Sequence, residues 1–196
     1  MAEECSGTTQ NGKIKNMVDK RILENCLFLD VETATGYRSF EDLETENPRL
    51  ADLWSKRAKY YRTVYEDMNG LSDSEIYKEK ATLEPEFSRV VCVSFGVLQE
   101  SGQVRMTSFY GDDEEEILTK CAKVFNNAHV KGMKLAGHNI KGFDIPCLGK
   151  SIFIASCRGR SSFCNLISYT ILFWWTSFNC ACCTFRTVRC KAKYFI

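Results

Sequence analysis

The sequence predicts an α/β fold, a mixed sheet flanked by helices. Short apolar runs predict strands, a periodic amphipathic segment between Asp112 and Ala128 predicts a helix, and the two kinds of segment alternate along the chain. With 196 residues, of which 44% are hydrophobic and 26% charged, the chain is long enough for one domain with a core. The expected order is strand, helical insertion, hairpin, helix, short strand, helix.

The first core strand is predicted at residues 26–32, where an apolar run ends in Asp30 and Glu32. We expect this strand to be covered on both faces and to end in a turn at residues 33–36. Because side chains alternate along a strand, the two acids share one face, while Leu29 and Val31 point to the other.

A helical insertion is predicted at about residues 39–85. Asn47 and Pro48 fit the cap and first position of one helix, and Ser72-x-x-Glu75 is a capping-box pattern for another that stops near Pro85. Apolar residues recur every three or four positions in the first helix, which predicts one buried face: Leu50, Leu53, Trp54, Ala58, Tyr61 and Tyr65. The opposite face carries Lys56, Arg57 and Lys59. This spacing favours a core role for Trp54 and Tyr61 over base stacking.

A hairpin is predicted next, with strands at residues 90–98 and 104–110 beside the first strand. The acids at residues 112–116 begin the amphipathic helix, and we interpret them as a solvated cap because a helix N-terminus favours negative charge. A brief strand at residues 134–136 then leads into Gly137-His138-Asn139.

The segment from Gly137 to Pro146 contains a second candidate constellation. Asp144 can cap a helix whose first turn contains Pro146, where the missing N–H does no harm. Asn139 and Phe143 can define a wall beside this carboxylate. An ordinary helix N-terminus explains the same segment equally well.

Asp30 and Glu32 need a compensating positive charge if they lose hydration, because like charges on one strand face repel each other. Hard carboxylate oxygens suit Mg²⁺ or Mn²⁺, and a pair of such ions can activate water and stabilise a leaving oxygen in phosphodiester cleavage. In the simpler alternative, the strand ends at Asp30 and both acids are solvated. A phosphatase with Asp30 as nucleophile is disfavoured, since such enzymes usually have a second aspartate where this chain has Glu32.

Taken together, the two segments resemble the first and second motifs of the DEDD-type 3′–5′ exonucleases, whose fold is ribonuclease H-like. Asp30-x-Glu32 matches the first motif, and Asn139-x-x-x-Phe143-Asp144 matches the second. The resemblance covers about residues 23–150. The residues around both motifs are most similar to those of the bacterial group related to the proofreading domain of family B DNA polymerases.

This resemblance implies a hydrolase that uses two Mg²⁺ or Mn²⁺ ions to remove nucleotides from the 3′ end of single-stranded or frayed DNA, or of RNA, in proofreading or DNA repair. Asp30 would bridge both ions, Glu32 would bind the first and Asp144 would hold the second. The residues expected to contact the substrate are Thr33, Asn139 and Phe143.

The family's third motif, a fourth aspartate with a tyrosine or histidine four or five residues before it, does not follow Asp144. Residues 151–196 contain six basic residues but no Asp, Glu or His, while residues 1–150 hold all 25 acids. We favour a shifted reading frame or mispredicted gene end after about Lys150. A membrane helix over the uncharged residues 161–185 is second, and a diverged tail that binds nucleic acid is third. We therefore expect weak or absent turnover, and a non-catalytic nucleic-acid-binding module of the same fold is the competing function.

The predicted organisation is a flexible N-terminus at residues 1–22, a partial exonuclease domain at 23–150 and an aberrant cysteine-rich tail at 151–196. Eleven cysteines lack a framework of spacings and residues 1–15 lack an apolar signal segment, so a reducing, cytoplasmic setting is expected. The crowded Cys180, Cys182 and Cys183 have no acid or histidine beside them, which disfavours a metal cluster. No membrane partner is expected, and the sequence does not specify the oligomeric state.

Overall fold

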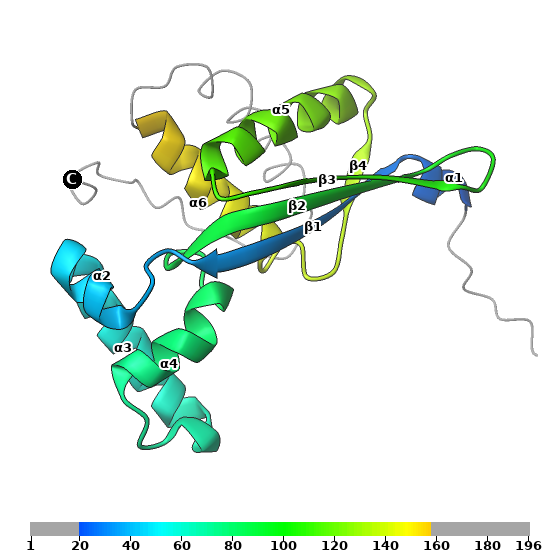
Figure 1. The fold of residues 1–196 in the computed structure, drawn as a ribbon. Helices are drawn as coiled ribbons and strands as arrows, with labels where there is room; N and C mark the ends of the chain where they lie inside the picture. The colour runs from blue at the N-terminus through cyan, green and yellow to red at the C-terminus, as the bar shows by residue number, and fades with distance from the viewer. Residues whose placement is uncertain (1–19, 158–196) are drawn as a thin grey trace, which may run out of the picture.

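A computed structural model describes residues 20–157 of the chain. Its fold is α/β, with a four-stranded mixed sheet in the order β3-β2-β1-β4 (Figure 1). β1 pairs antiparallel with β2 and parallel with β4, and β2 pairs antiparallel with β3. The strands are β1 (Cys26–Thr35), β2 (Ser88–Leu98), β3 (Val104–Tyr110) and β4 (Lys134–Ala136). The predicted α/β class, hairpin and short fourth strand are confirmed.

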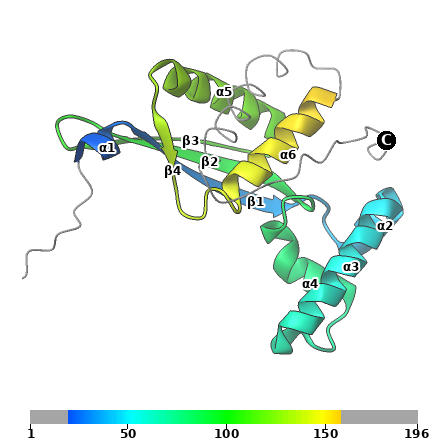
Figure 2. The same cartoon turned by 180° about the vertical axis from the view of Figure 1, so that it is seen from behind.

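The helices that follow β1 form two groups. The first, α5 and α6, packs on one side of the sheet, and the second forms an arm that leaves the end of β1 on the other side (Figures 1 and 2). We call residues 40–83 the helical arm, and the sheet with α5 and α6 the body. The helices are α1 (Lys20–Glu24), α2 (Phe40–Glu46), α3 (Pro48–Val64), the 3₁₀ turn η1 (Glu66–Met68), α4 (Asp73–Lys80), the 3₁₀ turn η2 (Ala81–Leu83), α5 (Glu114–Val130) and α6 (Asp144–Cys157).

β1 contributes alternate side chains to the core of the body. Its buried residues in this core are Leu27, Leu29 and Val31. Asp30 and Glu32 are exposed, so the prediction of a strand covered on both faces is wrong for this half of β1. The predicted turn at residue 33 is also wrong, because the ladder with β2 continues as far as Thr35.

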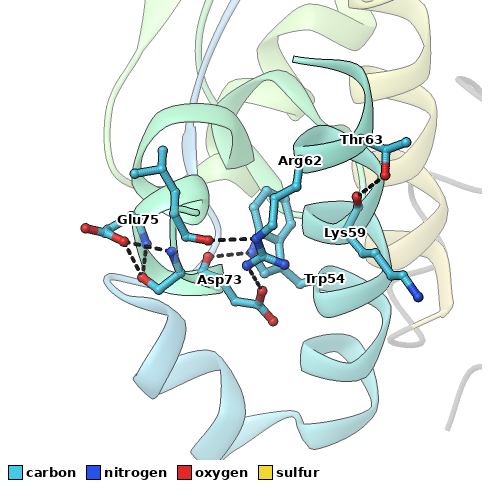
Figure 3. Close-up of polar contacts among 8 residues, drawn as sticks. Trp54, Lys59, Arg62, Thr63, Asp73 and Glu75 are labelled. Atoms are coloured by element: carbon cyan, nitrogen blue, oxygen red, sulfur yellow. Dashed lines mark hydrogen bonds and ion pairs between the residues drawn. The ribbon is translucent and has the colours of Figure 1, made fainter. Parts of the chain in front are cut away.

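The helices of the arm begin where the sequence predicts. The Asn47 side chain accepts a hydrogen bond from the Leu50 amide at 3.2 Å, and Pro48 is the first residue of α3. Ser72 and Glu75 form the predicted capping box at the start of α4 (Figure 3). Local capping chemistry therefore determines the boundaries of these helices.

Trp54 is the centre of a second core inside the arm and is completely buried. Its indole N–H donates to the Asp73 carbonyl at 2.9 Å (Figure 3). Its ring meets the rings of Tyr77 and Phe87 edge-on, with centroids 5.0 and 4.8 Å away. These contacts confirm that Trp54 is a core residue and not a base-stacking residue.

The buried face of α3 is narrower than the sequence predicts. Its members are Ala51, Trp54, Ala58 and Tyr61. Leu53 and Tyr65 were predicted on this face but are 53% and 45% exposed. Leu53 is adjacent to Trp54 and so points about 100° away around the helix, and Tyr65 follows the last residue of α3.

α5 begins with the predicted acidic turn, in which the Asp113 side chain accepts hydrogen bonds from the amides of Glu115 and Glu116. Glu114 departs from the solvated cap that the sequence predicts. Its carboxylate accepts hydrogen bonds from the Val90 amide and the Ser151 hydroxyl, both at 2.7 Å. Glu114 therefore joins α5 to β2 and α6.

α6 continues past residue 150 to Cys157, and Ser151 and Ile152 are buried. The predicted boundary at residue 150 thus lies inside a helix. Residues 1–19 and 158–196, with the uncharged stretch at 161–185, lie outside the described residues. Within residues 20–157, no helix combines the length and hydropathy needed to cross a membrane. The free cysteines of that range include Cys26, Cys92, Cys121 and Cys147.

Candidate active site

Asp30 and Glu32 lie on the face of the sheet opposite α5 and α6. In the ladder with β2, Asp30 is opposite Ser94 and Glu32 is opposite Cys92. Both acids are exposed, and the register shifts directly after Glu32. Their shared face follows from the alternation of side chains along β1, as the sequence predicts.

β4 pairs with β1 only over Cys26–Phe28, so it ends before the acids. The chain leaves β4 through Gly137, which lies so close to the Leu29 carbonyl that an added Cβ would overlap this oxygen. Asn139 has a φ of 49°, in the left-handed region that asparagine tolerates better than most residues. This tight connection brings the start of α6 against the edge of β1 beyond β4.

Asp144 is the first residue of α6, with Pro146 in the same turn as predicted, and is only 2% exposed. The backbone amide of Val31, the residue between Asp30 and Glu32, lies close enough to this carboxyl group to lower its pKa. The structure therefore brings the three predicted acids into one neighbourhood, although Asp144 is more than a hundred positions from Asp30 and Glu32 in the sequence.

The environment of Asp144 disfavours its charged form. Burial raises the pKa of Asp144, and the carboxylates of Asp30 and Glu32 raise it further, while hydrogen bonds to its own amide and to that of Val31 act in the opposite direction. A divalent cation would reverse this balance, because it attracts all three carboxylates.

The chemistry of this donor set suits a hard cation, because the donors are carboxylate oxygens. Within residues 20–157, no group of three or more His, Cys, Asp or Glu side chains lies close enough together to hold a metal ion. The three acids are thus electrostatic neighbours without forming a closed ligand set, and metal binding stays a prediction.

The other predicted site residues have local structural contacts. The Thr33 hydroxyl donates to the Thr82 carbonyl at 2.6 Å and so fastens the arm to β1. The Asn139 side chain lies beside Gly142, where a Cβ would approach its Oδ1 to 2.5 Å. Phe143 is partly buried against the body core. Their substrate-binding roles stay predictions.

The sequence analysis missed a polar network behind the acids. The Lys150 ammonium group donates to the Ser88 carbonyl, and Ser151 donates to Glu114. Burial lowers the pKa of Lys150 and raises the pKa of the Cys147 thiol to about 11. These contacts hold α6 on β2 and thereby the position of Asp144. The signal in the sequence was the pair Cys147 and Ser151, which follow Asp144 by three and seven positions and so share its side of α6, whereas Lys150 follows by six and gave no such signal.

Comparisons with protein-family models, with curated proteins and with solved structures gave no match.

Proposed function

We propose that this chain is a metal-dependent 3′–5′ exonuclease of the DEDD type, with a ribonuclease H-like fold and impaired turnover. The observation that carries the proposal is the position of Asp144, which is buried beside the Val31 amide and within electrostatic reach of Asp30 and Glu32, because it joins the acid of one motif to the two acids of the other. An ordinary helix N-terminus has no need for a buried carboxylate beside two further acids. Sites whose neighbours perturb a pKa in this way are typical of function.

In this proposal each acid has its own role. Asp30 would bridge two Mg²⁺ or Mn²⁺ ions, Glu32 would bind the first, and Asp144 would hold the second. The bound ions would supply an activated water and would stabilise the leaving oxygen of a phosphodiester. The chain itself supports Asp144 through the Val31 amide and through the contacts that fix α6 on β2. The open side of the sheet leaves Asp30 and Glu32 accessible to the end of a nucleic-acid strand.

Turnover is proposed to be weak because the aspartate of the third motif, which would be the fourth carboxylate of the site, does not follow Asp144 in this sequence. No Asp, Glu or His occurs among residues 151–196, so the first metal site would be incomplete. Incomplete coordination lowers both the affinity for the ion and the stabilisation of charge in the transition state.

The test is release of nucleotides from the 3′ end of a labelled DNA or RNA strand in Mg²⁺ or Mn²⁺, together with direct titration of Mn²⁺ binding. We expect Mn²⁺ to bind, nucleotide release to be slow or undetectable, and Asp30→Ala to weaken the binding of Mn²⁺. Asp67→Ala is the matched control, since Asp67 is an exposed acid in the arm. Mn²⁺ binding that Asp30→Ala and Asp67→Ala affect equally would rule out the exonuclease site. Rapid release that needs Asp30 would instead contradict the impairment.

A non-catalytic nucleic-acid-binding module of the same fold is the second candidate, and the missing fourth carboxylate is what favours it. This candidate requires binding of a single strand in EDTA, with an affinity that falls as salt rises because phosphate contacts release counterions.

A further inference from the structure

α3 has a second stripe of side chains on the face opposite its buried one. Arg49, Leu53, Lys56, Tyr60 and Val64 follow at intervals of three or four residues and so share one side of the helix. Leu53, Tyr60 and Val64 are 53%, 54% and 50% exposed. A surface helix normally has charged and polar residues on this side, so three aligned apolar side chains indicate an interaction surface.

The same helix has a local excess of positive charge. It contains five basic residues and one acid, which gives a net charge of +4. Arg57 pairs with Glu84 at 3.3 Å and Arg62 pairs with Asp73. Lys56 and Lys59 are exposed, and neither forms an ion pair within the described part of the chain. Figure 3 shows the Lys59 side chain pointing away from the Arg62–Asp73 contact.

This positive charge belongs to α3 and not to the arm as a whole. The neighbouring α2 contains four acids and no base, so the two helices have opposite net charges of −4 and +4. The two exposed lysines lie on the same side of Tyr60 around α3, Lys56 about 40° and Lys59 about 100° away from it at roughly 100° per residue. An ammonium pair beside an exposed aromatic ring fits a ligand with both anionic groups and flat rings.

The arm is also well located for such a ligand. It is fastened to β1 at Thr33, directly after Glu32, by the hydrogen bond to Thr82. In both views the arm extends on the side of the sheet opposite α5 and α6, which is the side that exposes Asp30 and Glu32 (Figures 1 and 2). α3 has 17 residues and is therefore about 25 Å long at 1.5 Å per residue, enough to follow several nucleotides.

We propose that the outer face of α3 binds the backbone of single-stranded nucleic acid, with Lys56 and Lys59 on phosphates and Tyr60 stacked on a base. This inference rests on the proposed function for the class of ligand, and it adds a surface outside the carboxylate site. Phosphate neutralisation by lysine and base stacking on tyrosine are the two contributions on which sequence-independent binding of single strands depends. A membrane surface fits less well, because a stripe of three apolar residues is narrow for an interfacial helix.

The first test measures binding of a fluorescent oligothymidylate to the full chain in EDTA at several salt concentrations. Lys56→Gln with Lys59→Gln should weaken binding and reduce the slope of log K against log salt by about 1.4, since each phosphate contact on a single strand contributes about 0.7. The matched control is Lys123→Gln with Lys131→Gln, which removes the same charge from exposed positions at α5. An equal loss in both pairs, or no binding by the unmodified chain, overturns the proposal.

The second test separates stacking from charge. Tyr60→Ala should weaken binding at least about fivefold, and Tyr60→Phe should retain it, because base stacking requires the ring and not the hydroxyl. Equal affinity in Tyr60→Ala and the unmodified chain overturns the stacking role. Sedimentation with phosphatidylserine vesicles is measured in parallel, and lysine-dependent vesicle binding without oligonucleotide binding overturns the assigned ligand.

The outcome is independent of hydrolysis, because EDTA removes divalent ions. If oligonucleotide binding depends on the lysines but Mn²⁺ binding does not depend on Asp30, the proposed α3 surface is supported and the exonuclease site is excluded. If Mn²⁺ binding depends on Asp30 but oligonucleotide binding does not depend on Lys56, Lys59 or Tyr60, the carboxylate site is supported and the proposed α3 surface is excluded.

Discussion

The body and the helical arm bury different kinds of side chain. The core of the body is mainly aliphatic and adjoins the buried Asp144, whereas the core of the arm is mainly aromatic, around Trp54 and Tyr77. In the arm, buried polar atoms have close partners, such as the indole of Trp54 on the Asp73 carbonyl and the Tyr61 hydroxyl on Glu84 at 2.5 Å. In the body, a carboxylate is buried beside two like charges. The arm is therefore organised for stability, and the body tolerates an unfavourable charge where a site is proposed.

The largest effect is expected from removing the centre of the arm's core. Trp54→Ala should lower the free energy of unfolding by about 3–5 kcal/mol, because it leaves a cavity and an unpaired Asp73 carbonyl. Urea denaturation followed by far-UV circular dichroism measures the change. Leu53→Ala, one residue away but 53% exposed, should cost far less, and equal effects would contradict a separate packed core in the arm.

A smaller effect is expected where the chain passes β1 on its way to Asp144. Gly137→Ala should destabilise the fold by about 1–3 kcal/mol, since its Cβ would overlap the Leu29 carbonyl. Gly149→Ala is the matched control, because nothing lies within 4 Å of a Cβ there and alanine favours the helix by up to about 1 kcal/mol. Thermal unfolding of both variants should thus shift in opposite directions. Shifts of the same sign would contradict the close approach at Gly137.

The sequence predicted those parts of the fold that depend on local chemistry. The caps at Asn47 and Ser72, the hairpin and the acidic start of α5 follow from residues within a few positions of each other. The shared face of Asp30 and Glu32 also follows from strand geometry alone. The meeting of these acids with Asp144 could be expected only through the resemblance, because it depends on how far β4 pairs with β1.

The errors of the sequence analysis come from tertiary packing. Helical spacing alone cannot show that the arm covers only a narrow face of α3, so Leu53 and Tyr65 were assigned to its core. An acid at a helix start is equally favourable in solvent or turned inwards, so the inward contacts of Glu114 were missed. The full length of β1 could not be predicted without knowing its partner strand, because pairing with β2 as far as Ser88 extends β1 past the acids.

The smallest effect is expected at Asp144, and its pH dependence tests the unfavourable charge directly. Because the pKa of Asp144 is raised in the folded state, mainly by burial and then by Asp30 and Glu32, the unfolded chain loses this proton first as the pH rises. The stability of the fold should therefore begin to fall as the pH rises through the pKa of Asp144 in the unfolded chain. The contribution of this group is fully lost above its pKa in the folded state.

The variant Asp144→Asn has no such titration and keeps an acceptor for the Val31 amide. In EDTA, its thermal midpoint should exceed that of the unmodified chain at neutral pH and approach it in acid. A divalent ion that binds this site should reverse the order at neutral pH, since only the carboxylate gains from the cation. A variant that is less stable at neutral pH in EDTA would mean that Asp144 stabilises the fold as an ordinary helix-start acid, and the contrast between arm and body would then lose its basis.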